Sequence, residues 1–220
     1  MKHQIAIVLL AACVSSAGSA WADGLSSLEI FIKTVSSGRA DFTQVVTAPA
    51  REGQTARSKT SSGTFEFTRP GRFKFIYKKP FEQSIVADGQ TLWLYDVDLN
   101  QVTARKQASA LGTTPAALIA SAPDLRALQA DFTLSSAPDQ DGLQWLLASP
   151  KAKDGQLQAV RVGFRQNGKA ASSNELAALE IIDNFGQRSV LSFTKVEVNP
   201  VLPADTFSFK PPKGADVIRQ

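Results

Sequence analysis

The chain has 220 residues, with 24 Lys and Arg against 20 Asp and Glu, and it contains one His, one Cys and one Met. These three residues are His3, Cys13 and Met1, so all of them lie close to the N-terminus. If that segment is removed, the rest of the chain can form no Ser-His-Asp triad, Cys nucleophile, Cys/His zinc site, His- or Met-ligated haem, or disulfide. The composition therefore argues against an enzyme. The small positive charge of +4 also gives no reason to expect a polyanionic partner.

The first residues have the pattern of an export signal. Lys2 is followed by the apolar run Ile5–Ala12, and Ala20-Trp21-Ala22 fits the small-x-small cleavage pattern. We therefore predict a signal peptide over residues 1–22 and a single exported, water-soluble domain over residues 23–220. A second interpretation stays open, because Leu10-Ala11-Ala12-Cys13 resembles the box before a lipidated bacterial cysteine.

The mature chain begins with a predicted amphipathic helix. Ser26 and Glu29 have the spacing of a capping box. The apolar side chains that follow recur at helical intervals and end near Gly38; they are Leu28, Phe31, Ile32 and Val35. After this helix the apolar period changes to two, which predicts strands.

The predicted strands form an antiparallel meander. The first covers Ala40–Thr47, and the polar stretch Ala48–Ser62 is expected to be a loop or weak edge strands. Turns are predicted at Arg69-Pro70-Gly71 and, with two residues, at Asp88-Gly89. The further strands are expected around Phe65 and Phe67, Phe73 to Tyr77, Ile85-Val86, Leu92 to Tyr95, Gln101 to Lys106, Phe132 to Leu134, Leu143 to Leu147, Leu157 to Phe164, Leu176 to Ile182, Ser189 to Val198, and Phe207 with Phe209.

An Ala-rich segment interrupts the strands. Pro115 can open a short helix over Ala116–Ser121, and a second short helix is expected over Pro123–Gln129. The predicted fold class is therefore α+β and mainly β. It is an incomplete antiparallel β-barrel, or curved sheet, with an N-terminal helix and short lid helices that enclose a hydrophobic cavity.

Several patterns that resemble functional sites are better explained by structure. Ser192 and Lys195 have a Ser-x-x-Lys spacing, but strand alternation predicts that they point to opposite faces. Asp96-x-Asp98 and Asp139-x-Asp141 lie in turn-rich sequence, where Asp is favoured without any metal. A basic stripe alternates with aromatic residues as on a strand with one wet face, so no nucleic acid is expected as a partner; it comprises Arg72, Lys74, Lys78 and Lys79.

Arg69 has two possible roles. It precedes Pro70, which restricts it to extended backbone geometry. It is either an exposed turn residue or a guanidinium group that reaches backbone carbonyls of another element. The pattern alone does not decide between them.

The runs Gly63 to Tyr77 and Val86 to Asp96 resemble the LolA family, periplasmic carriers of outer-membrane lipoproteins in Gram-negative bacteria. Thr114 to Ala120 is similar to the lid helix of that family, and Phe207 to Gly214 to its C-terminal end. The resemblance implies a monomeric periplasmic carrier, with no cofactor, whose cavity holds lipoprotein acyl chains. An inner-membrane ABC-type complex would load it, and the outer-membrane receptor LolB would unload it.

The resemblance also implies roles for individual residues. Arg69 matches the arginine that hydrogen-bonds the lid backbone in the closed, empty state. The residues expected at the acyl-chain cavity and lid are Phe65, Phe67, Phe73, Phe75, Trp93, Leu118 and Ile119. Two alternatives remain: a lipid-anchored receptor like LolB, for which Cys13 would be the lipidated residue, and an envelope hydrolase that uses only carboxylates.

Overall fold

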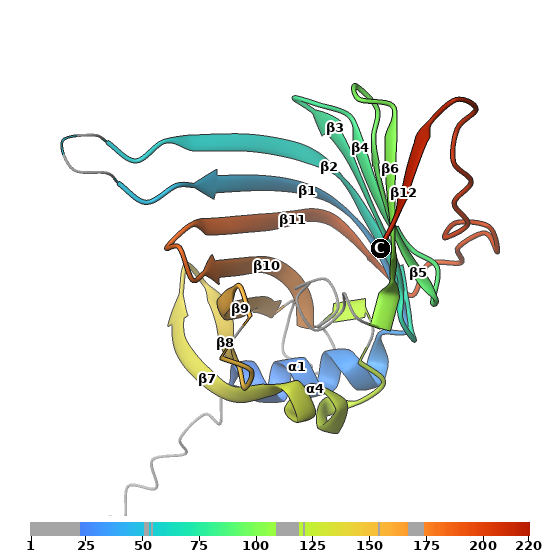
Figure 1. Ribbon diagram of the computed structural model, residues 1–220. Helices are drawn as coiled ribbons and strands as arrows, with labels where there is room; N and C mark the ends of the chain where they lie inside the picture. Colours follow the sequence, from blue (N-terminus) through green and yellow to red (C-terminus); the bar gives the residue numbers. More distant parts are fainter. Residues whose placement is uncertain are drawn as a thin grey trace, which may run out of the picture.

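The computed structural model describes residues 23–50, 53, 55–108, 119–120, 122–153, 155–166 and 174–220. The predicted signal peptide, Cys13 and Leu118 lie outside these residues. The described part is mainly β and forms one 12-stranded sheet with helices at one end (Figure 1). The helices are α1 (Gly24–Thr34) and α4 (Leu125–Asp131). The strands are β1 (Ser37–Thr47), β2 (Ser58–Thr68), β3 (Arg72–Lys79), β4 (Gln83–Ala87), β5 (Thr91–Asp96), β6 (Gln101–Lys106), β7 (Phe132–Gln140), β8 (Leu143–Pro150), β9 (Leu157–Gln166), β10 (Asn174–Asp183), β11 (Arg188–Val198) and β12 (Asp216–Arg219).

The sheet is curved but open. Its strand order is β12-β6-β5-β4-β3-β2-β1-β11-β10-β9-β8-β7, so β12 and β7 form two separate edges. Neighbouring strands are antiparallel except for β12, which pairs in parallel with β6. The sheet bends around α1, which lies with α4 at the lower end in Figure 1. The predicted curved sheet with an N-terminal helix is therefore confirmed.

Helix α1 presents the predicted apolar stripe to the sheet. Leu28, Phe31 and Ile32 are buried, as expected from their spacing. The predicted N-cap, Ser26, is wrong: Asp23 is the cap, and its carboxylate accepts a hydrogen bond from the Ser26 amide at 2.8 Å. The helix ends at Thr34 because Val35 has extended backbone geometry and leads into β1.

The core lies on the face of the sheet that packs against α1, called here the inner face. Strand register places Phe42 of β1, Phe65 of β2 and Phe75 of β3 on this face. Each of them is buried. Side chains at alternating positions point to opposite faces of a sheet, so the opposite, outer face carries the residues between them.

The structure corrects several local predictions. Residues 58–62 belong to β2 and pair with β1, so they form a strand and not a loop; the pairing of β2 with β3 begins at Ser62. The β4–β5 connection has three residues, Asp88 to Gln90, and Asp139 lies within β7. The helix predicted over Pro123–Gln129 begins and ends two residues later, because Asp124 caps it through the Ala127 amide.

Phe207 and Phe209 do not form a strand. Their rings lie against the outer face, where Phe209 is 5.4 Å from Trp93 and the Arg72 guanidinium is 5.8 Å from Phe207. The last strand is β12, which follows this segment. The tail thus covers the outer face over β3 to β6 before it adds an edge strand.

The predicted opposite orientation of Ser192 and Lys195 is also wrong. The β1–β11 register shifts between Arg39 and Asp41, and Lys195 has a positive φ of 50°. This bulge lets Lys195 pair with Asp41 at 2.8 Å, while Ser192 pairs in register with Thr43, two residues further along β1. Lys195 is therefore engaged in an ion pair on the side of the sheet where Ser192 lies.

Candidate functional site

Phenylalanine side chains fill the space between the inner face and α1. Phe65 and Phe75 stack with ring centroids 4.3 Å apart, and Phe65 also lies 5.6 Å from Phe67 and 5.7 Å from Phe193. From the helix, Phe31 contacts Phe67 at 6.1 Å. Such offset aromatic pairs add about 0.5–1.5 kcal/mol each beyond the burial of their area. The cluster is therefore a tightly packed apolar interior.

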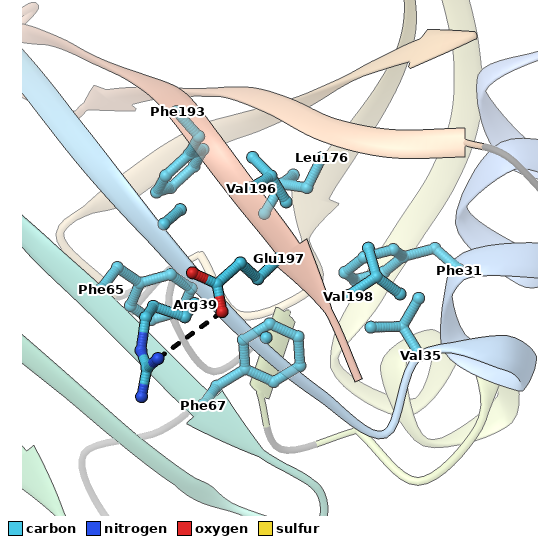
Figure 2. A pocket seen from close by; sticks show the side chains of 12 residues that line it. Phe31, Val35, Arg39, Phe65, Phe67, Leu176, Phe193, Val196, Glu197 and Val198 are labelled. Atoms are coloured by element: carbon cyan, nitrogen blue, oxygen red, sulfur yellow. Dashed lines mark ion pairs between the residues drawn. The ribbon is translucent and has the colours of Figure 1, made fainter. Parts of the chain in front are cut away.

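Among the described residues, this interior contains a small cavity. A cavity of about 20 Å³ lies beside the β1–β11 bulge, as Figure 2 shows, and its lining includes Phe31, Phe65, Phe67 and Phe193. An ion pair between Arg39 and Glu197, at 3.5 Å, lies at its edge. A volume of this kind holds about one water molecule. An acyl chain therefore does not fit into this cavity.

Most of the predicted cavity residues are brought together. Phe65, Phe67, Phe73 and Phe75 are between 0% and 5% exposed, and Ile119 is 2% exposed in the same cluster. Ile119 comes from the segment between β6 and α4. With Ala120 and Ala122, which are also buried in this cluster, it forms what we call the cover segment.

Trp93 lies elsewhere, so its assignment to the cavity does not hold in this structure. Its neighbours Leu92 and Leu94 pack against the core, so Trp93 points to the outer face. There its indole NH donates to the Asp88 carboxylate at 2.8 Å, and its ring packs against Phe209. Trp93 thus anchors the C-terminal tail and the β4–β5 turn.

Arg69 is partly buried and reaches two backbone carbonyls of other elements. Its Nε donates to the carbonyl of Val35 at the end of α1, at 2.8 Å, and its Nη1 donates to the carbonyl of Ala122, at 3.2 Å. The guanidinium also lies over the rings of Phe31 and Phe67, at 5.3 and 5.5 Å. Of the two roles left open by the sequence, the geometry is that of a guanidinium bridging separate elements.

The electrostatics of Arg69 are unusual. Its Nη2 is buried without a hydrogen-bond partner, and within the described ranges no carboxylate pairs with the guanidinium. Burial lowers the pKa of Arg69 to about 10, so the group is still charged at neutral pH. A buried charge held only by carbonyls and ring faces stabilises a closed arrangement less than a fully paired one would.

The backbone of the Arg69–Gly71 turn adds two more bonds. The Arg69 amide donates to the Ser36 carbonyl at 2.8 Å, and the Gly71 amide donates to the Ala120 carbonyl at 3.0 Å. Gly71 has a φ of 72°, a conformation that glycine adopts without strain. This turn therefore holds both the end of α1 and the cover segment.

Sequence patterns could not find the partners of Arg69, because any residue presents a carbonyl and the side chains of Val35, Ala120 and Ala122 carry no signal. Phe42 and Phe193 were also missing from the predicted site, although strand alternation alone places both on an apolar face. Register then brings them opposite each other across β1 and β11.

Beyond the helices, the inner face opens into a groove of about 500 Å³. Five adjacent strands contribute to its wall: Gln44 pairs with Ser61 across β1 and β2, and Gln83 of β4 pairs with Tyr77 of β3 and with Asp96 of β5. Phe81 and Leu99 stand exposed at its rim, at the β3–β4 and β5–β6 turns. The groove is wide but mixed in polarity, unlike the aromatic interior.

The remaining chemistry is sparse. Within the described ranges there is no group of three or more His, Cys, Asp and Glu that could hold a metal ion. Asp96 acts as a turn residue, because its carboxylate accepts a hydrogen bond from the Leu99 amide at 3.0 Å. Over the same residues, no helix combines the length and apolar character needed to cross a bilayer.

Comparison with known proteins gives consistent matches. Residues 33–210 match the family model described as outer membrane lipoprotein carrier protein LolA. Proteins named outer-membrane lipoprotein carrier protein are 75% identical in Albidiferax ferrireducens, over 94% of this chain and 97% of that protein, and 54% identical in Methylibium petroleiphilum, over 97% and 98%. Among solved structures, a LolA superfamily protein of Nitrosomonas europaea has a TM-score of 0.50 at 14% identity, covering 85% of this chain and 98% of that one, which supports the fold alone.

Proposed function

This chain belongs to the LolA family of outer membrane lipoprotein carrier proteins, and on that premise we propose that it carries lipoproteins through the periplasm to the outer membrane. It is a carrier and not an enzyme. The acyl chains of the cargo are the part that must be kept from water. An inner-membrane ABC-type release complex supplies the cargo, the receptor LolB accepts it, and the carrier acts as a monomer.

The observation that carries the proposal is the closed aromatic interior beneath the cover segment. Each CH₂ group removed from water contributes about 0.8 kcal/mol, so fully buried acyl chains would be held almost irreversibly. In this protein the acyl chains must displace phenylalanine contacts that already exist, such as the stacking of Phe65 on Phe75. The net gain on loading is thereby reduced, which makes release achievable.

We propose that Arg69 acts as a latch of the empty state. Hydrogen bonds from a charged donor contribute about 1.5–3 kcal/mol each, and Arg69 donates two of them to carbonyls of separate elements. Loading separates the cover segment from α1 and breaks the bond to Ala122. A ligand shifts an equilibrium between two states only by its difference in affinity for them. The hydrogen bonds of Arg69 therefore set how much of the binding free energy of the cargo is used to open the cover segment.

The cavity assignment follows from the same geometry. We propose that Phe65, Phe67, Phe73 and Phe75 line the space that opens, with Ile119 on the cover. Leu118 is proposed as a lid residue on the resemblance alone.

The direct test is release of a lipoprotein from inner-membrane vesicles. The protein starting at Asp23 is added, the vesicles are removed by centrifugation, and lipoprotein in the supernatant is measured. A soluble complex of cargo and carrier supports the proposal; lipoprotein that stays with the vesicles, although the release complex is active with another carrier, contradicts it.

The Arg69→Leu variant tests the latch. We expect it to accept cargo as the wild type does but to transfer less of it to the receptor, because closure no longer regains the hydrogen bonds. Arg165→Leu is the matched control, since Arg165 is half-exposed and pairs with Glu175 on the sheet surface. Normal onward transfer by Arg69→Leu would remove the latch from the proposal.

The receptor-like alternative predicts a different mature N-terminus. The intact mass of the protein purified from envelopes decides between them. A chain starting at Asp23 supports the carrier, and a lipidated Cys13 supports the receptor.

A further inference from the structure

Gln107 links the turn that holds Arg69 to a second turn. Its side-chain amide donates through Nε2 to the Gly71 carbonyl and accepts through Oε1 from the Gly89 amide at 2.9 Å. Its own backbone amide donates to the Gln90 carbonyl at 2.8 Å. Gln107 is 2% exposed, although a glutamine after a strand would ordinarily face solvent.

The orientation of this amide is fixed by its partners. A carbonyl can only accept and a backbone amide can only donate, so the NH₂ group must face Gly71 and the oxygen must face Gly89. Both ends of the side chain are satisfied in a buried position, which makes the bridge specific.

The Gly89 side of the bridge is rigid. Asp88 accepts the amides of Gln90 and Thr91, each at 2.8 Å, and the indole NH of Trp93 through its other oxygen. Burial opposes these bonds, but together they hold the pKa of Asp88 below its usual value. The carboxylate thus stays charged at neutral pH and holds the β4–β5 turn.

The Gly71 side is where the bridge acts on the cover segment. Gly71, whose carbonyl accepts from Gln107, donates its own amide to the Ala120 carbonyl. Arg69, two positions earlier, donates to the Ala122 carbonyl. A Cβ atom at position 71 would lie 3.4 Å from the Gln107 Nε2, so the two are in close contact.

We propose that Gln107 is a positioning residue for the latch. It ties the Arg69–Gly71 turn to the rigid β4–β5 turn. The Arg69–Gly71 turn is thereby held where it can donate hydrogen bonds to the Ala120 and Ala122 carbonyls. This inference rests on the proposed carrier function for its consequence: without Gln107 the empty state closes less firmly, and transfer falls as with Arg69→Leu.

The first test needs no cargo. In Gln107→Leu the Gly71 carbonyl and the Gly89 amide lose their partners, and a buried polar group without a partner is destabilising. We expect hydrogen exchange of the Gly71 amide to rise about tenfold or more, with exchange at Val160 and Val162 in the core changed less than about twofold. Gln44→Leu is the control, because it removes a comparable side-chain amide, bonded to Ser189, on β1.

Gln107→Glu separates the two ends of the bridge. A carboxylate keeps an acceptor for the Gly89 amide but has no donor for the Gly71 carbonyl. Exchange at Gly71 should therefore rise while exchange at Gly89 stays near the wild-type rate. An equal rise at both glycines, or none at Gly71, contradicts the assigned role.

A double-mutant cycle distinguishes positioning from simple loss of stability. If Gln107 acts through the turn that holds Arg69, the double variant Gln107→Leu/Arg69→Leu should exchange at Gly71 about as fast as the faster single variant. A product of the two single effects would show independent action and overturn the inference. Because exchange is measured on the empty protein, this outcome is separate from failure of the carrier function, which the vesicle assay reports.

Discussion

The inner face of the sheet is built differently at its two ends, although the same strands form both. Under α1 it is aromatic, and the cavity that described residues line there has a volume of about 20 Å³. Beyond the helices it opens into a groove of about 500 Å³. On β2 the change takes four residues, from Phe65 to Ser61, and on β3 the aromatic row ends at Tyr77. Burial raises the pKa of the Tyr77 hydroxyl, as expected at the boundary between a packed layer and an open one.

This difference shows that free volume and apolar character are separated in the empty protein. The open end has room, but amide, hydroxyl and carboxylate groups line it, and these groups would lose water if acyl chains covered them. The covered end is apolar, and the cavity that its described residues line is too small for an acyl chain. Under the proposed carrier function the cover segment would have to move, and the hydrogen bonds of Arg69 would oppose that movement.

The largest effect on stability is expected from removing an aromatic ring in the covered end. Phe65→Ala removes a ring that is 1% exposed and contacts Phe67, Phe75 and Phe193. We expect a loss of about 3–5 kcal/mol in the free energy of unfolding, measured by urea denaturation. A loss under about 1 kcal/mol would mean that the interior repacks easily and is not the rigid layer described here.

The second-largest effect on stability is expected at Gly63, which lies between the covered end and the groove. Gly63 of β2 pairs with Phe42 and Tyr77, and a Cβ there would lie 1.9 Å from the Ile76 carbonyl oxygen. Gly63→Ala should force β2 and β3 apart and cost about 1–3 kcal/mol, again measured by urea denaturation. Gly142→Ala provides a contrast without steric overlap, since nothing lies within 4 Å of its Cβ, although its positive φ adds some strain.

A smaller, pH-dependent effect is expected at the β4–β5 turn. Asp88→Asn places an NH₂ group against the Trp93 indole NH, and we expect a loss of about 1 kcal/mol at pH 7. The folded pKa of Asp88 lies below its usual 3.8, so its contribution is present above that value and is lost as the pH falls through the folded pKa. The melting temperatures of the two proteins should therefore differ at pH 7 and converge as the pH falls well below the usual pKa of 3.8. A difference in melting temperature that persists in acid would show that the loss comes from hydrogen-bond geometry and not from the charge of Asp88.

The smallest effect is expected in the groove. Gln83→Leu replaces a half-buried side chain on an open wall, and such changes usually alter stability by less than about 0.5 kcal/mol. The melting temperature should stay near that of the wild type. A clear loss of stability would show that the polar lining of the groove is part of the packed structure and would weaken the contrast between the two ends.

Sequence periodicity predicted the strands that separate two unlike environments. Phe73 and Phe75 alternate with Arg72 and Lys74, so both the strand and its inner face could be recognised. Ser58 to Ser62 carries no such contrast, because its place in β2 is fixed by pairing with Thr43 to Thr47 of β1. Long-range pairing of small polar residues leaves no local pattern.

At Trp93, sequence alternation could not tell which face of the strand the side chain occupies. Leu92 to Tyr95 is apolar throughout because both faces of β5 are covered, one by the core and the other by Phe209. No alternation then tells which side chain faces inward. Phe207 and Phe209 show the reverse case: aromatic residues at alternating positions predict a strand, but here both rings pack against the outer face instead of extending the sheet.

The open sheet has a consequence for behaviour at high concentration. Two edge strands remain, and an unpaired edge is a template for pairing with another chain. Here β7 carries Pro138 and Asp139 near its end, and β12 has only four residues and includes the charged Asp216 and Arg219. Proline, charge and short length all discourage edge-to-edge growth. An open sheet with two free edges is in this way kept from joining to its own copies at high protein concentration.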